Sequence, residues 1–149
     1  MINDTLKLRG DLQIVLKDKD GKVKESRTEK NLIVSAGLTF ICDRMADASS
    51  SVMSHMAVGS GTTSPAAGNT DLVSILGARE ALDSTTSSSN TVVYVSSFEA
   101  GEGTGAITEA GVFNASTSGT MLCRTVFAVV NKGANDTMAI TWTITLSAS

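Results

Sequence analysis

Residues 137–146 read Thr-Met-Ala-Ile-Thr-Trp-Thr-Ile-Thr-Leu, so that apolar side chains alternate with small ones, four of which are threonines. Successive side chains of a β-strand point to opposite faces, and this stretch therefore predicts a strand with one apolar face and one threonine face. Threonine is β-branched and favours a pleated surface, so the outward face also supports a strand. The apolar face must be buried against a second layer, which the rest of the chain has to supply.

The composition predicts one domain, residues 1–149, with a surface that is hydroxylated rather than charged. Of the 149 residues, 42% are apolar and 18% are charged, while 19 serines and 18 threonines together make 37. A chain of this length can bury a real core as a single domain. The alternating arrangement of the apolar residues argues against disorder.

The charge distribution gives no sign of a nucleic-acid or membrane partner. Residues 1–30 hold 8 basic and 6 acidic side chains, and residues 31–149 hold 4 basic and 9 acidic, so neither part makes a dense basic surface. No stretch approaches the roughly 20 apolar residues of a membrane span, and no secretion signal is recognisable. We therefore expect assembly in a reducing cytoplasm, with Cys42 and Cys123 as free buried thiols.

Residues 6–34 are predicted to form a long β-hairpin. Leu12, Ile14 and Leu16 alternate with polar residues, and residues 18–21, Asp-Lys-Asp-Gly, form a turn signal in which Gly21 can adopt a positive φ. The return strand stays polar until Leu-Ile-Val at residues 32–34. We interpret this hairpin as a projecting arm that reaches a neighbouring subunit, and a plain surface hairpin is the alternative.

Residues 35–47 are the best helix candidate. Ser35 is a suitable N-cap. Apolar side chains recur at spacings of three and four, which places them on one face and predicts that this face is buried. The residues of that face are Leu38, Ile41, Cys42 and Met45.

The remainder of the chain predicts an antiparallel β-sandwich, because short apolar strands alternate with Gly, Ser and Asn turns. A jelly roll with one helix packed at an end or edge is the version we favour. Residues 84–90 are expected to be a loop, and residues 71–82 are ambiguous between a helical turn and a strand. Further strands are expected at residues 52–59, 91–100, 106–114 and 121–130.

No catalytic constellation is recognisable, so the sequence predicts a protein that is not an enzyme and assigns no catalytic, cofactor-binding or metal-binding residue. His55 is the only histidine and lies between apolar residues, which is typical of a satisfied interior or boundary residue. Glu99 and Glu102 flank a glycine loop and Glu109 follows on the next strand. A carboxylate pair for acid–base chemistry is conceivable there, but nothing indicates a pocket.

The loops and aromatic residues also favour a structural reading. The glycine-rich residues 59–70 lack the Gly-Lys-Ser/Thr ending of a phosphate-binding loop, and residues 101–105 lack the dinucleotide-binding pattern. Tyr94 and Trp142 are the single tyrosine and tryptophan, and both fall in strand patterns. We therefore expect both rings to pack in the core.

Two parts of the sequence resemble small virion structural proteins of tailed bacteriophages. The first runs from residues 31–38 into residues 54–63, and the second comprises residues 105–114 and 119–127. The resemblance extends over roughly residues 31–146. It implies a non-enzymatic protein on the capsid exterior of the virion, most like a decoration (cement) protein that binds the major capsid protein lattice. It also implies a homo-oligomer, with a trimer favoured.

Two other functions stay open. A tail-fibre or baseplate component predicts association with phage tails. A carbohydrate-binding or hydrolytic β-sandwich predicts affinity for a glycan, although aromatic residues make up only 4% of the chain.

Overall fold

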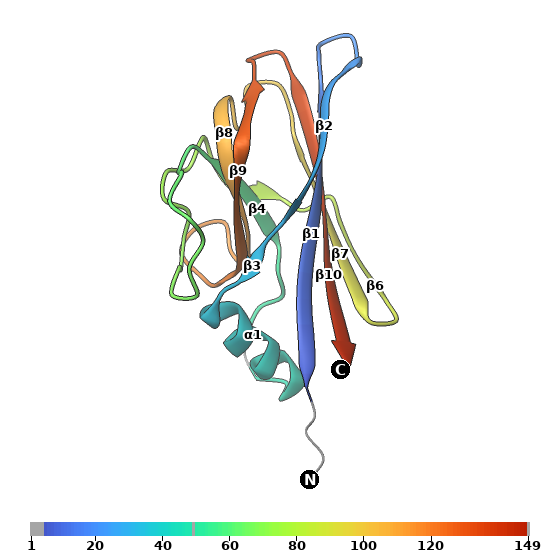
Figure 1. Ribbon diagram of the computed structural model, residues 1–149, viewed down its shortest axis with the longest axis vertical. Coiled ribbons are helices and arrows are strands. Elements are labelled where there is room, and N and C mark those ends of the chain that lie inside the picture. The colour runs from blue at the N-terminus through green and yellow to red at the C-terminus, as the bar shows by residue number, and fades with distance from the viewer. Residues whose placement is uncertain (1–4, 49, 149) are drawn as a thin grey trace.

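The computed structural model describes residues 5–48 and 50–148, which form two antiparallel five-stranded sheets and one helix. Figure 1 shows the sheets as two layers, with the helix α1 (Ser35–Met45) at one end between them. Sheet A has the order β2 (Val23–Lys30), β1 (Leu6–Lys17), β10 (Thr137–Ala148), β7 (Thr91–Phe98), β6 (Ser84–Ser88). Sheet B has the order β3 (Leu32–Ile33), β9 (Met121–Lys132), β8 (Gly105–Phe113), β4 (His55–Gly59), β5 (Glu80–Ala81). The predicted antiparallel sandwich with one helix is confirmed, and the jelly-roll path stays a prediction.

Strand β10 is the centre of sheet A, where it lies between β1 and β7. Its apolar side chains point inward and its threonines point outward, as the alternation predicts. Trp142 is fully buried, and its Nε1 donates a hydrogen bond of 3.0 Å to Oδ1 of Asn31. The main core fills the space between the sheets, and its largest buried members include Trp142, Phe98, Leu12, Ile14, Met56 and Ile107.

The N-terminal hairpin is present, but it is part of the sandwich rather than a separate arm. Strand β1 pairs with β10 over its whole length, and Leu12, Ile14 and Leu16 are buried in the core. Gly21 occupies the turn with φ 82°, as predicted. Most of the hairpin is therefore built into sheet A, because the alternating leucines and isoleucine of β1 are needed to build the core. Its role as an arm that reaches a neighbouring subunit stays a prediction.

The return strand is divided at Asn31. Strand β2 belongs to sheet A, whereas β3 pairs with β9 in sheet B, so the chain crosses between the sheets at this residue. The Asn31 side chain lies directly over Gly10, where any β-carbon would collide with it. Gly10 thus leaves room for the amide that binds the indole of Trp142.

The helix begins and ends differently from the expectation. Val34 is the N-cap and makes no side-chain capping bond, Ser35 is the first helical residue, and the helix ends at Met45 rather than at residue 47. The buried face is also different. A β-carbon on Gly37 would lie 2.1 Å from the carbonyl oxygen of Leu122, so the helix rests on β9 through Gly37 and the neighbouring Phe40. The helical residues expected to be buried but found exposed are Leu38, Cys42 and Met45.

The expected loop at residues 84–90 is also wrong, because residues 84–88 form strand β6, paired with β7. All five β6 residues are exposed, so neither face carries the apolar alternation that identifies a half-buried strand. The ambiguous residues 71–82 contain only the two-residue strand β5 and a single bridge between Ile75 and Gly59.

Candidate functional site

The outer face of sheet A is a broad surface of short hydroxylated and β-branched side chains. Two rows of paired residues cross its central strands, because Val95 lies opposite Thr141 and Val93 lies opposite Thr143. Strand β6 extends both rows at the edge of the sheet. We call this surface the hydroxyl face, and it comprises Ser84, Thr86, Val93, Val95, Thr141 and Thr143.

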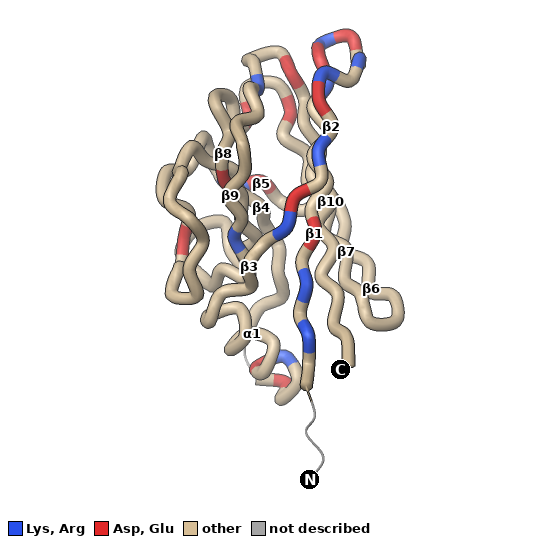
Figure 2. The backbone as a smooth tube through the Cα atoms, viewed as in Figure 1, with Lys and Arg blue, Asp and Glu red and all other residues tan. Residues whose placement is uncertain are grey.

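The hydroxyl face is accessible and uncharged. Its four central side chains are half-buried, while Ser84 and Thr86 are exposed. Figure 2 shows that β6, β7 and β10 carry no charged residue, whereas acidic and basic residues follow β1 and β2 toward the turn between them. The neutral part of sheet A is therefore bordered on one side by a charged hairpin.

The outer face of sheet B is covered instead. Residues 60–79, which we call the cover loop, run across it, and Leu72 of this loop contacts a second buried cluster. The cluster takes its other members from the outer face of sheet B and from the segment that precedes the helix: Val34, Ala57, Phe113 and Met121. Sheet A therefore presents the more open of the two outer faces.

A buried ion pair fixes the cover loop to sheet B. Arg124 on β9 donates from Nη2 at 2.8 Å and from Nε at 3.0 Å to Oε2 of Glu109 on β8, and both side chains are fully buried. The Glu109 carboxylate also accepts hydrogen bonds from the amides of Gly61, Val73 and Ser74 at 3.0, 3.1 and 2.7 Å. A charge pair in a dry interior requires such additional partners.

Arg124 and Glu109 are both engaged with the chain itself. Arg124 reaches the cover loop through the carbonyl of Thr63 at 2.9 Å and Oδ1 of Asn69 at 3.1 Å. Burial by itself would raise the pKa of Glu109, but the hydrogen bonds from Ser74, Arg124, Val73 and Gly61 lower it below its ordinary value. The carboxylate is thus held ionised as a structural anchor.

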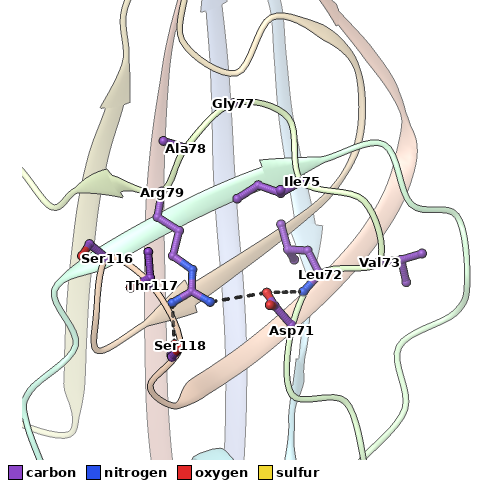
Figure 3. A pocket seen from close by; sticks show the side chains of 10 residues that line it. All are labelled: Asp71, Leu72, Val73, Ile75, Gly77, Ala78, Arg79, Ser116, Thr117 and Ser118. Atoms are coloured by element: carbon purple, nitrogen blue, oxygen red, sulfur yellow. Dashed lines mark hydrogen bonds and ion pairs between the residues drawn. The ribbon is translucent and has the colours of Figure 1, made fainter.

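A hollow of about 380 Å³ lies between the cover loop and the turn that follows β8 (Figure 3). Arg79 crosses it and donates to the carbonyls of Ala115 at 2.9 Å and Ser118 at 2.7 Å, with Asp71 3.5 Å away. Its guanidinium also lies 3.6 Å from the ring centroid of Phe113. Because this cation binds oxygens of the chain itself, we assign Arg79 the role of holding the two loops together.

A second, apolar hollow of about 300 Å³ lies beside the helix, with Phe40, Met45, Tyr94 and Leu146 among its lining residues. Burial raises the pKa of Tyr94 to about 12. Tyr94 is nearly buried, as expected from its strand pattern.

The acidic residues considered in the sequence are not brought together as an acid–base pair. Glu109 is paired with Arg124, and Glu102 accepts the amide hydrogen of Glu99 at 2.7 Å within their own loop. His55 is half-buried, with Nδ1 2.8 Å from Oγ of Ser54. Within residues 5–48 and 50–148, no group of three or more His, Cys, Asp or Glu side chains is placed to hold a metal ion.

Sequence reasoning missed Arg124, which is fully buried, and Arg79, whose side chain is 6% exposed. Arg124 stands in an apolar run on β9 and Glu109 in an apolar run on β8, and these strands are neighbours in sheet B. The sequence did contain a signal for this pair, since the apolar part of each of these two consecutive strands carries one charged residue and the two charges are opposite. An isolated buried charge is costly and requires a partner, so the two residues could have been predicted to pair. The sequence around Arg79 contains no comparable signal.

Comparisons with protein-family models, with curated proteins and with solved structures find no match to this chain. Among the described residues, the structure contains no helix with the length and apolar character needed to cross a membrane.

Proposed function

We propose that this chain is a non-enzymatic structural protein of a tailed-bacteriophage virion, which binds the exterior of the assembled capsid as a decoration protein. The sequence resemblance suggests the class of protein, and the hydroxyl face of sheet A is the observation that supports a docking role. Its partner is the lattice of the major capsid protein, and the face of sheet A lies against that lattice.

The chemistry of the hydroxyl face suits a broad contact better than a small-molecule site. The central parts of protein interfaces are depleted of charged residues, and this face has none. Short side chains such as Ser, Thr and Val also lose less conformational entropy on burial than long charged ones do. Its hydroxyl groups keep the unbound surface hydrated and can form hydrogen bonds with a partner.

The area of the outer face of sheet A is large enough to contribute to such a contact, because many copies bind one lattice and neighbouring copies add contacts of their own. The three uncharged strands β6, β7 and β10, about 4.8 Å apart and about eight residues long at about 3.3 Å per residue, span roughly 400 Å². The whole outer face of sheet A, which also includes the charged strands β1 and β2, spans roughly 600 Å² by the same spacing. A standard interface buries about 800 Å² on each partner, so one face supplies most of that area. Contacts between neighbouring copies supply the rest, and three copies at a capsomer junction are the arrangement that the resemblance favours.

A binding experiment with capsids that lack the protein tests this proposal. Thr141→Lys and Thr143→Lys each place a charge on the hydroxyl face, and we expect each to weaken capsid binding by about tenfold or more, equivalent to about 1.4 kcal/mol. Thr117→Lys is the matched control, because Thr117 is exposed in the turn after β8, on the side of sheet B. Binding is measured by co-sedimentation after thermal melting has shown that all three variants fold.

Three results would contradict the proposal. The first is wild-type protein that fails to sediment with capsids. The second is equal binding by the hydroxyl-face variants and the Thr117→Lys control. The third is co-sedimentation with isolated tails in place of capsids, which would favour the tail-fibre or baseplate function.

A further inference from the structure

The edges of the two sheets differ in how well they are protected against pairing with another strand. An edge strand presents unpaired backbone N–H and C=O groups, and natural proteins usually blunt it by shortness, charge or proline. In sheet B the edge strands β3 and β5 are only two residues long. In sheet A the edge strand β2, Val-Lys-Glu-Ser-Arg-Thr-Glu-Lys, carries five charged side chains in eight residues.

Strand β6 lacks all of these protections. It is five residues long, with the sequence Ser-Thr-Thr-Ser-Ser, and it contains neither a charge nor a proline. It pairs in regular antiparallel register with β7 on one side, and no described strand lies on its other side. All five residues are exposed, so no described side chain or loop covers this edge. The backbone of β6 is therefore free to accept another strand.

We propose that two copies of this protein pair through their β6 edges, antiparallel and about a two-fold axis that passes beside Thr86. In this register, Thr86 of one copy lies opposite Thr86 of the other, and Ser84 lies opposite Ser88. The contact joins the two A sheets into one continuous ten-stranded sheet. It is independent of capsid binding and is expected of the isolated protein.

The occupant is a second copy because β6 is self-complementary. A two-fold contact places the same patch against itself, so a charged strand would bring like charges near one another. Strand β6 brings only hydroxyl groups together, and facing Thr–Thr and Thr–Ser pairs stabilise antiparallel strands through hydrogen bonds. A two-fold pair also aligns the hydroxyl faces of the two copies on the same side of the joined sheet.

Disulfide trapping tests the pairing directly, because it detects a contact of short lifetime. Facing residues of antiparallel strands have Cα atoms about 4.5–5.5 Å apart, which lies within the range that a disulfide can bridge. The variant Thr86→Cys is made in a Cys42→Ser background, since Cys42 is exposed while Cys123 is buried. Thr28→Cys in the same background is the control, because Thr28 is likewise exposed on the outer side of an edge strand.

We expect mild oxidation to convert Thr86→Cys into a covalent dimer at least about tenfold faster than Thr28→Cys, as measured on non-reducing gels. Equal rates for the two variants would overturn the proposal. The register is tested by mixing Ser84→Cys with Ser88→Cys, which should cross-link much faster than either alone. If Ser84→Cys alone forms dimers as fast as the mixture does, the two-fold pairing about Thr86 is wrong.

Discussion

Glu109 and Arg124 form a 2.8 Å ion pair with both side chains fully buried, and this pair connects adjacent strands of sheet B to the loop that covers them. The carboxylate binds three backbone amides of the cover loop, and the guanidinium binds a carbonyl and an amide oxygen of the same loop. The pair therefore helps to hold the cover loop on the outer face of sheet B, together with Leu72 and Arg79. The outer face of sheet A remains available for contact.

Arg124→Met removes the cation and leaves the Glu109 carboxylate buried without its partner. We expect the free energy of unfolding to fall by about 3–5 kcal/mol, as for other buried ion pairs that lose one member. Chemical denaturation measures this change. The matched control is Arg9→Met, which breaks the exposed pair with Asp11 and should cost less than about 1 kcal/mol.

The double variant Glu109→Gln, Arg124→Met should be more stable than Arg124→Met alone, because it no longer buries an unpaired charge. A loss below about 1 kcal/mol in Arg124→Met would contradict the anchoring role of the pair.

Stability should decrease in acid because of Glu109. Its pKa in the folded protein lies below the ordinary value of 4.5, so the folded state favours the ionised form. This contribution is complete above the unfolded-state pKa, and it is lost as the pH falls from about 4.5 through the lower pKa of the folded state. Denaturation curves across this range should show a shallower pH dependence in Glu109→Gln than in the wild type, and parallel slopes would contradict the assignment.

Gly37→Ala should destabilise the protein, although alanine is intrinsically better than glycine in a helix by about 0.5–1 kcal/mol. The new methyl group would lie 2.1 Å from the backbone carbonyl of Leu122, so the helix would have to move off β9. We expect a loss of about 1–3 kcal/mol in the free energy of unfolding. Gly68→Ala is the control, because nothing lies within 4 Å of its added methyl group and its stability should be unchanged or slightly higher.

Trp142→Ala should lower the free energy of unfolding by about 3–5 kcal/mol, since it leaves a large cavity between the sheets. It also removes the donor that satisfies Oδ1 of Asn31, at the point where the chain crosses between sheets. Val129→Ala, at a residue that is 44% exposed, should cost much less. Equal losses in thermal or chemical denaturation would show that Trp142 does not organise the core.

Sequence periodicity predicted the parts of the fold in which one face of an element is buried. Trp142 and its neighbours on β10 alternate between core and surface, and Tyr94 and Phe98 on β7 do the same. Strand β6 was not predicted because both of its faces are exposed. Its five residues are all serine or threonine, so no apolar side chains alternate along it. Apolar and polar residues alternate along a strand only where one of its faces is buried. The pattern therefore does not identify an edge strand that is exposed on both faces.

The helix and the buried ion pair show why other features were missed. The spacing of apolar residues in the helix predicted that the face with Leu38 and Met45 is buried. In the structure the face with Gly37 meets β9, because the missing side chain of Gly37 lets the helix approach the backbone of Leu122. Glu109 and Arg124 are 15 positions apart, and only the pairing of β8 with β9 brings them together. Both outcomes depend on contacts between distant segments, which local patterns do not encode. The hydroxyl face could not be predicted from the sequence either, because only the strand order of sheet A brings its residues together.

Electron cryo-microscopy of phage particles that contain this protein is the most direct test of the proposed capsid role. We predict density for the sandwich over the head lattice at capsomer junctions, with the outer face of sheet A turned toward the capsid. Density confined to the tail, with bare capsomers, would contradict the proposal. Density on the head with Thr141 and Thr143 facing solvent would contradict the assigned docking face.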